Sequence, residues 1–406
     1  MPRPDASART DAAARAASDA GRSPDTDAGA LDPPPAPALD SFGPSVERLG
    51  APPGTAFSFA VQDGTLGFQL AGANLWIDTL TDPRGRAYYA DGLPVGWPSA
   101  LYGPGSPQAF MNDATVALGI VPGEWTATLL ASTGGAPISL VAQRDHDGMF
   151  HGGVLDLYLY VARGGVTDPD RGVTIAPGNV VAEYAEGIDR FFDKLSRLVG
   201  IDRGEVTVIA VDDRYAAIDG DAEEDAAFGA SQAGLGPGYH AMLVRGGYER
   251  GWAGITPAAP AEQLAGAPRS TVLMDVRGRD YFDFTLLHEL GHVTGLYHPS
   301  DVYVEAGVSH FLHDPLGDTS ECTRTTALMG ETFPACFEES NLMASYAMTR
   351  PPTLSPTQLA IFRSSAVYRP YTADRPVVRS LRIGGPGLRP PPPDVAARWT
   401  HCTPPG

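Results

Sequence analysis

The sequence predicts an α+β fold in which an all-β module precedes a domain that mixes helices and strands. Residues 55–163 contain short runs of aromatic and β-branched residues, which Gly, Pro and Asp separate at regular intervals. Apolar residues then recur at helical spacing over 180–199. A helix-capping signature follows near the end of the chain, at 355–358. A helix, strands, a second helix, loops and a third helix in this order are typical of an α+β domain.

Both ends of the chain lack the apolar residues that a core needs. Residues 1–54 alternate Ala, Asp, Arg and Ser before a proline-rich run at 33–37, so we expect a disordered spacer. Residues 1–30 have no apolar segment of the kind a signal peptide needs, so either an export signal lies upstream of Met1 or the protein is cytosolic. Residues 372–406 are rich in Arg and Pro and are expected to be an extended tail.

The β module is expected over residues 55–163. Its predicted strands share short length, β-branched or aromatic residues and flanking turn residues, and they are 56–61, 65–70, 74–80, 114–121, 124–131, 138–143 and 153–162. About seven short strands with regular turn signals predict a β-sandwich.

The α+β domain is expected over residues 166–371. An apolar stripe over 180–199 predicts a helix of about five turns. The strands expected in this domain are 205–211, 239–244 and 270–276. The sequence Ser355-Pro356-Thr357-Gln358 is a capping box with Pro at the first helical position, and it predicts a helix to about residue 368.

Composition narrows the classes of partner. The net charge of −19 argues against nucleic acid and anionic membranes, because both bind clustered Lys and Arg. No segment approaches the roughly 18–20 apolar residues of a transmembrane helix, so no membrane span is expected. The oligomeric state does not follow from the sequence.

The strongest chemical signal is the sequence from His288 to His298. On a helix, His288 and His292 lie four residues apart and present two imidazoles on one face. Gly295 permits a positive φ that ends the helix and turns the chain, so that His298 supplies a third nitrogen. Three neutral imidazoles leave one position of a tetrahedral Zn²⁺ open for water, which is typical of a catalytic site. Glu289 is then placed to act as general base on that water and later as general acid.

The spacing H-E-x-x-H-x-x-G-x-x-H over 288–298 resembles that of the metzincin superfamily of zinc endopeptidases. The resemblance covers about 166–371 and implies a twisted sheet with an active-site helix and a C-terminal helix. It also implies that 270–276 is the edge strand of that sheet, which pairs with an extended substrate. Metzincins also carry a methionine in a tight turn beneath the metal. Met343 is the candidate for that residue, with Met329 and Met348 as competitors and core packing as the overlapping interpretation.

Within the superfamily the chain is most similar to the pappalysin-like branch. Residues 313–320 resemble the Asp-x-x-x-Asp-Thr-Pro stretch of that branch, although Ser320 replaces the Pro. Residues 341–343 and 354–358 also look like their counterparts there. Pro299 instead resembles the serralysins, but the calcium-binding nonapeptide repeats of serralysins are absent from this sequence.

Two secondary sites keep alternatives open. Some metzincins place a Tyr two residues after the Met as an oxyanion donor or fifth metal ligand, but Ser345 occupies that place here and Tyr346 follows it. Tyr346 therefore stands either for this role or for packing at the rim of the site. Asp314, Asp318 and Glu321 offer oxygen ligands for Ca²⁺, and a solvated acidic loop is the alternative.

All three cysteines lie in the last quarter of the chain. Cys322 and Cys336 flank a short loop of roughly 15 residues, and a disulfide there would contribute about 3 kcal/mol in the chain-entropy model. Such a disulfide favours an oxidising, secreted or extracytoplasmic location. Cys402 is left over and is free, paired elsewhere or without a role.

These features predict a zinc-dependent endopeptidase that hydrolyses internal bonds of a protein or peptide substrate. One alternative is an extracellular binding or scaffold protein with a vestigial metzincin domain. The presence of Glu289 argues against it, because a decayed site has no reason to keep the base along with every ligand. The other alternative is a zinc hydrolase of a non-peptide substrate, since activated water attacks many carbonyl groups.

Overall fold

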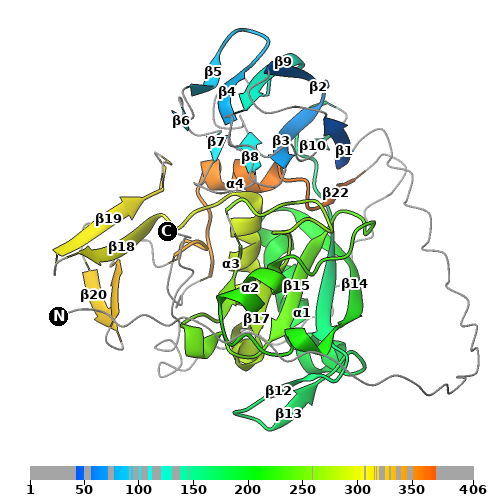
Figure 1. The fold of residues 1–406 in the computed structure, drawn as a ribbon, viewed down its shortest axis with the longest axis vertical. Helices are drawn as coiled ribbons and strands as arrows, with labels where there is room; N and C mark the ends of the chain where they lie inside the picture. Colours follow the sequence, from blue (N-terminus) through cyan, green and yellow to red (C-terminus); the bar gives the residue numbers. More distant parts are fainter. Residues whose placement is uncertain are drawn as a thin grey trace, which may run out of the picture. The chain divides into compact units, whose positions relative to one another are not determined.

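The computed structural model describes most of the chain between residues 43 and 371 (Figure 1). The described residues are 43–49, 56–71, 77–90, 93–94, 100–101, 108–111, 120–129, 138–145, 147–257, 259–305, 308–314, 316, 318–319, 325–328, 331–334, 340–344 and 351–371.

Two five-stranded antiparallel sheets make up the first part of the described chain. One has the order β1 (Ser45–Leu49), β10 (Ile138–Arg144), β3 (Thr65–Ala71), β8 (Gln108–Met111) and β7 (Ala100–Leu101). The other has the order β2 (Ala56–Val61), β9 (Gly123–Leu129), β4 (Ile77–Thr81), β5 (Ala87–Ala90) and β6 (Leu93–Pro94). We refer to these ten strands as the β-rich module.

Both sheets of the β-rich module contribute to one hydrophobic core. The Trp125 ring from β9 lies 5.1 Å from the ring of Phe68 on β3 and 5.1 Å from that of Tyr88 on β5. All three side chains are buried in the same cluster. Five of the seven predicted strands of 55–163 therefore form and share this core, with shifts of a few residues at their ends.

Strand β1 forms within a segment that was expected to be disordered. Residues 1–54 were expected to be disordered, yet β1 lies within them and pairs with β10 along its whole length, from Ser45 with Ala142 to Leu49 with Ile138. The reason is tertiary, since β10 supplies hydrogen-bond partners that local composition does not reveal. The strand expected at 114–121 lies outside the described residues except for 120 and 121.

A six-stranded sheet forms the second part of the described chain. Its order is β14 (Ile201–Val211), β11 (Gly153–Ala162), β15 (Tyr239–Val244), β17 (Val272–Asp275) and β16 (Gly254–Ile255), and β22 (Arg369–Pro370) pairs with β11. The pairs β14–β11, β11–β15 and β15–β17 are parallel, whereas β16 runs antiparallel to β17.

Pairing in this sheet corrects two expectations. The strand expected over 153–162 forms, but the prediction that it belongs to the β module was wrong. It pairs with β14 and β15 of the six-stranded sheet. The segment 270–276 was expected at the edge of the sheet. That prediction was wrong, because β17 has β15 on one side and β16 on the other, so β16 is the outermost described strand on that side. Neither choice of neighbour is encoded in a strand's own composition.

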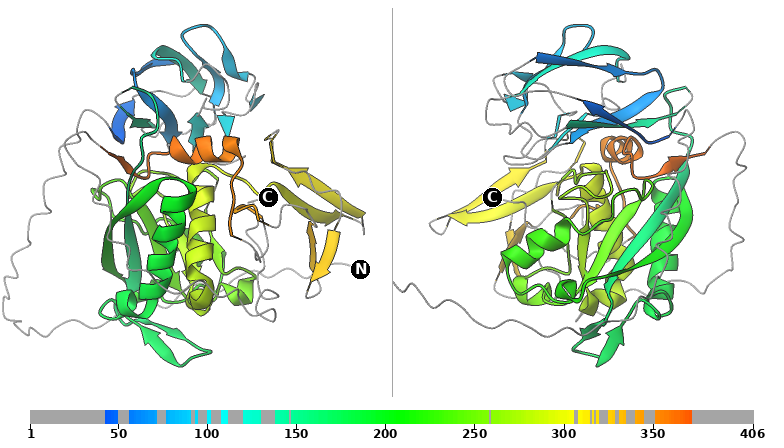
Figure 2. Two further views of the ribbon diagram at one scale, coloured as in Figure 1. Left: turned by 180° about the vertical axis from the view of Figure 1, so that it is seen from behind. Right: turned by 45° about the vertical axis from the view of Figure 1, so that its right-hand side comes forward.

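Helices α1 (Val180–Leu198) and α3 (Phe282–Thr294) lie side by side against one face of the six-stranded sheet (Figure 2). The α1 stripe was predicted, and its buried residues include Tyr184, Ile188 and Leu195. Tyr184 contacts Phe282 at the start of α3, with ring centroids 4.6 Å apart. This packing holds α3, which carries the histidine motif.

The remaining elements are short. They comprise α2 (Asp221–Phe228), the 3-10 helices Asp213–Tyr215, Tyr248–Arg250 and Val276–Tyr281, and the hairpins β12 (Val166–Asp168) with β13 (Val173–Ile175), β18 (Ser300–Glu305) with β19 (Val308–His313), and β20 (Thr325–Leu328) with β21 (Glu331–Pro334). Among the described residues no helix is both long and apolar enough to span a bilayer.

The capping box at residue 355 is present as predicted. The Ser355 hydroxyl accepts from the Gln358 backbone N–H, and the Gln358 side chain accepts from the Ser355 N–H. Helix α4 (Pro356–Arg363) ends earlier than the predicted residue 368. The Ser364 hydroxyl donates to the carbonyl of Ala360 there, at 2.9 Å, and competes with continuation of the helix.

The other face of the six-stranded sheet contains a buried histidine. His240 on β15 stacks on Tyr158 with ring centroids 4.7 Å apart, and its Nδ1 lies 2.8 Å from the Tyr160 hydroxyl. Burial lowers the pKa of His240 from 6.5 to about 4. The folded protein therefore holds this imidazole neutral at pH values where the unfolded chain protonates it.

We expect the free energy of unfolding to fall as the pH drops from 6.5 toward 4, because only the unfolded state then binds a proton on His240. The pKa difference corresponds to a loss of about 2 kcal/mol between pH 7 and pH 5. Urea unfolding at both pH values, with a chelator present throughout, measures it. In His240→Gln this part of the loss should disappear, and an equal loss in both proteins would contradict the assignment.

Candidate metal centre

The end of helix α3 sets the geometry of the histidine motif. Gly295 has a left-handed φ of 108°, and its N–H and that of Leu296 bond back to the last turn, at 2.9 Å to the His292 and Gly291 carbonyls. Only Gly adopts this φ without strain. The chain therefore reverses after Gly295 and brings His298 back toward the helix.

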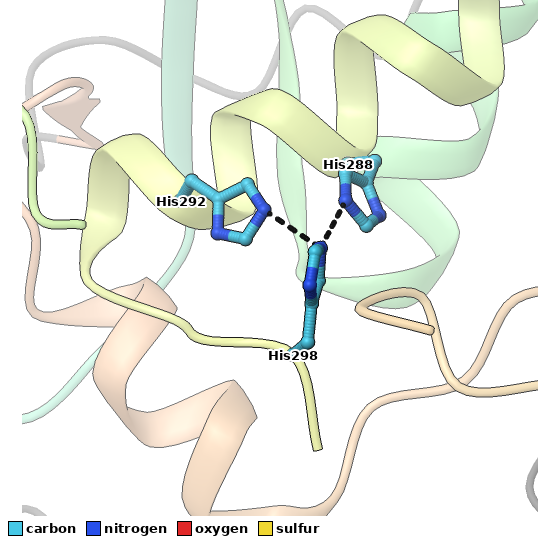
Figure 3. Close-up of side chains that lie close together, drawn as sticks. All are labelled: His288, His292 and His298. Carbon is cyan, nitrogen blue, oxygen red and sulfur yellow. Dashed lines mark hydrogen bonds between the residues drawn. The ribbon is translucent and has the colours of Figure 1, made fainter. Parts of the chain in front are cut away.

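His288, His292 and His298 converge as the sequence predicted. One ring nitrogen of each lies within 4.8 Å of the others, and all three side chains are buried. The Nε2 atoms of His288 and His292 each lie 3.2 Å from Nε2 of His298 (Figure 3).

Backbone carbonyls orient two of these rings. Nδ1 of His288 donates to the Leu342 carbonyl at 2.7 Å, and Nδ1 of His292 donates to the Leu296 carbonyl at 2.7 Å. With the proton on Nδ1, each neutral imidazole presents the lone pair of Nε2 to the centre of the triad. Burial and the neighbouring imidazoles hold the pKa of His292 well below its usual range, which keeps the ring neutral.

This donor set fits a tetrahedral zinc ion. Zinc–imidazole bonds of about 2.0–2.1 Å at tetrahedral angles separate the nitrogens by roughly 3.3–3.4 Å, close to the 3.2 Å seen here. Nε2 of His298 carries at most one proton, so it cannot form a full hydrogen bond to both neighbouring Nε2 atoms. A cation between the three nitrogens would give each of them a partner. His288, His292 and His298 would therefore hold the metal.

Glu289 directly follows His288 on helix α3, is buried, and contacts the segment around strand β16. Its Oε2 accepts from the Thr256 hydroxyl at 2.7 Å. A Cβ at Gly254 on β16 would lie 3.0 Å from Cγ of Glu289 and 2.5 Å from Cγ2 of Thr285, so β16 approaches the carboxylate because Gly254 has no side chain. The segment around β16 thus fixes the orientation of this carboxylate.

Met343 lies directly beneath the helix that carries the histidines. A Cβ at Gly291 would lie only 2.4 Å from Sδ of Met343, so Gly291, between the first two histidines, is in close contact with the thioether. The turn is held by Asn341, whose Oδ1 accepts from the Met343 N–H and whose Nδ2 donates to Gln358 Oε1, both at 2.9 Å. The preceding residue, Leu342, supplies the carbonyl that orients His288.

The structure describes only some of the other predicted site residues. Tyr346, Glu321 and all three cysteines, Cys322, Cys336 and Cys402, lie outside the described residues, so their proposed roles stay predictions. Asp318 accepts at Oδ1 from the Ser355 hydroxyl and at Oδ2 from the Thr357 N–H, each at 2.9 Å, and so stabilises the start of α4. Asp314 accepts at Oδ1 from the Leu316 N–H at 3.2 Å and from the Thr319 hydroxyl.

Sequence reasoning missed Thr256. Nothing in the motif at 288–298 points to a residue more than thirty positions earlier, and a lone Thr after a two-residue strand has no distinctive pattern. Only the position of β16 at the edge of the sheet brings this hydroxyl to Glu289.

Comparisons with known proteins add little. No protein-family model matches the chain, and no curated protein matches it. Among solved structures, the chain is similar to the crystal structure of archaemetzincin from Methanopyrus kandleri, with 15% sequence identity, coverage of 52% of this chain and 87% of that chain, and a TM-score of 0.22. Archaemetzincin is thus a distant structural neighbour of this chain. It gives no support to the narrower resemblance to the pappalysin-like branch.

Proposed function

We propose that this chain is a zinc-dependent endopeptidase of the metzincin type. The observation that carries the proposal is the buried triad of His288, His292 and His298, with two Nδ1 atoms bonded to carbonyls and the Nε2 atoms turned toward one another. Glu289 lies next to the first of these histidines in the sequence and on the same helix. Met343 beneath Gly291 is our candidate for the methionine of the Met-turn.

Two side chains of the protein act in the proposed reaction: Glu289 transfers a proton, and Thr256 orients Glu289. Bound zinc supplies electrophilic activation of a water molecule and of the scissile carbonyl. The Glu289 carboxylate takes the proton of the attacking water and later delivers it to the leaving amine. Thr256 holds that carboxylate in place through its bond to Oε2. The buried surroundings strengthen these interactions relative to water.

The edge of the six-stranded sheet favours a peptide substrate over other carbonyl compounds. Strand β16 is bonded to β17 through Gly254 and Ile255, and it ends the order of the described sheet. An outermost strand is a template for an extended peptide, which adds its own backbone hydrogen bonds. Because β16 directly precedes Thr256, such a peptide would pass close to Glu289.

Cleavage of an unstructured protein such as casein tests the proposal. Purified protein loaded with zinc should produce fragments, a chelator should abolish them, and added zinc should restore them. Internal fragments identified by mass spectrometry separate endopeptidase activity from removal of terminal residues. Cleavage that survives complete removal of zinc would overturn the proposal, and so would zinc-loaded protein that hydrolyses only non-peptide esters or amides. An extracytoplasmic location and a Cys322–Cys336 disulfide remain proposals from the sequence.

Replacing Thr256 with valine is expected to lower kcat about tenfold or more, because a hydrogen bond to a charged group is lost. KM should stay within about twofold, since the hydroxyl is assigned to the carboxylate and not to the substrate. Steady-state kinetics on a fluorogenic peptide measure both constants. Thr256→Ser restores the hydroxyl and should recover most of kcat, whereas equal rates in the Val and Thr proteins would show that the bond has no role in the reaction.

A further inference from the structure

One sheet of the β-rich module is buried on both faces. In β3, Phe68 and Leu70 belong to the module's own core, so alternation places Gln69 on the opposite face. Gln69 is nevertheless 0% exposed, and so is Gln143 on the neighbouring strand β10. Val141, which pairs with Gln69, is also buried. The outer face of this sheet is therefore covered.

The second sheet of the module behaves differently. Along β2 (Ala56–Val61) and β9 (Gly123–Leu129), exposed and partly exposed residues alternate with buried ones. That alternation is typical of an antiparallel sheet with one face in solvent. A free two-sheet module would show it in both sheets, so the burial of Gln69 and Gln143 indicates a specific neighbour.

The neighbour of Gln69 is a backbone segment almost two hundred residues away. Its Nε2 donates to the Ala261 carbonyl at 2.9 Å, and its Oε1 accepts from the Gln263 N–H at 3.0 Å. One side-chain amide thus uses a donor and an acceptor on a single backbone segment, much as an adjacent strand would. Gln143 forms a second connection, from its Nε2 to the Tyr368 carbonyl at 3.3 Å.

The segment that Gln69 contacts also supports the end of helix α3. The Gln263 side chain donates from Nε2 to the Val293 carbonyl at 3.2 Å and accepts at Oε1 from the Ala366 N–H at 2.8 Å. Val293 directly follows His292 in the sequence. A continuous path of buried and partly buried hydrogen bonds therefore runs from the β-rich module to the helical turn that carries a histidine of the triad.

We propose that the β-rich module is a permanent structural partner of the part of the chain that contains the six-stranded sheet and the histidine triad. The module docks there through the outer face of the sheet β1-β10-β3-β8-β7. It is neither a detachable propeptide nor a separate recognition domain. Separation of the two parts would expose Gln69, Val141 and Gln143 on the module. It would also leave the backbone groups of the 261–263 segment without their partners. Buried polar groups left without partners are costly. The inference does not depend on peptidase activity.

A cleavable linker tests the inference with the full chain. Residues 147–149 form a turn between β10 and β11, and Met149 is 62% exposed. A recognition sequence for a specific protease is inserted after Met149. Cleavage there breaks the covalent link between the β-rich module and the rest of the protein. We expect the two fragments to co-elute in size-exclusion chromatography after cutting, with the zinc stoichiometry unchanged. Separation of the fragments in non-denaturing buffer would overturn the proposal.

Substitution of Gln69 tests the contact itself. Gln69→Met keeps the approximate volume and removes both hydrogen bonds, so the thermal unfolding midpoint should fall by about 5–10 °C. After cutting, its fragments should separate. Gln62→Met is the matched control, because Gln62 is exposed in the turn that precedes β3. Equal midpoints in the two variants would refute a role for Gln69. If Gln69→Met does not fold, Gln143→Met and the cut wild-type protein supply the same comparison.

Discussion

Replacing Glu289 with glutamine will reduce peptide hydrolysis by about 10²–10⁴-fold while the zinc content stays unchanged. Glu289 is 1% exposed, so an isosteric amide preserves the packing and still accepts the Thr256 hydrogen bond. The amide has no lone pair basic enough to take a proton from water, so only the proton transfer is lost. Steady-state kinetics together with elemental analysis for zinc measure the two quantities separately.

Glu186→Gln provides the control for this experiment. Glu186 lies on helix α1, its side chain is 87% exposed, and its ion pair with Arg190 is a surface pair of small energetic value. The same chemical change there should leave the rate within about twofold. If Glu289→Gln retained more than about a tenth of the wild-type rate, the general base would have to be another group and the role given to Glu289 would be wrong.

Replacing His298 with alanine will remove most of the bound zinc. Two imidazoles in place of three leave too few protein ligands for a stable site. Loss of a hydrogen-bond partner of a metal ligand already raises the dissociation constant of the metal by roughly 10–100-fold. Loss of the ligand itself should raise the zinc dissociation constant by more than that. Competition with a chromophoric chelator measures this change. Thermal stabilisation by added zinc, which the wild-type protein should show, should largely disappear as well.

His151→Ala is the matched control for His298. His151 is exposed and its Nε2 lies 2.9 Å from Oδ2 of Asp147, on the turn between β10 and β11. Its loss should leave zinc affinity unchanged. A His298→Ala protein that binds one zinc ion with wild-type affinity would show that the three histidines do not form the metal centre.

Local patterns in the sequence were sufficient for the elements whose signals lie within a few turns of chain. Helix α1 follows its apolar stripe almost to the residue, and the capping box sets the start of α4 at Pro356. The histidine motif is local in the same sense. Its spacing on one helix face and the glycine that ends α3 bring three imidazoles together without long-range information. The three histidines are therefore predictable from the sequence alone.

The tertiary structure alone decided which distant segments meet. Strand β11 could have paired with the strands before it or after it, and its composition is compatible with either sheet. The same limit applies to β16, whose outermost position brings Thr256 to Glu289, and to Gln69, which finds its partners 192 and 194 residues away. Such contacts depend on the path of the long segments that connect the residues. That path is determined by the burial and hydrogen bonding of the whole chain. The sequence by itself thus determined the three histidines and the glutamate that we propose as ligands and base, and the fold determined what orients them.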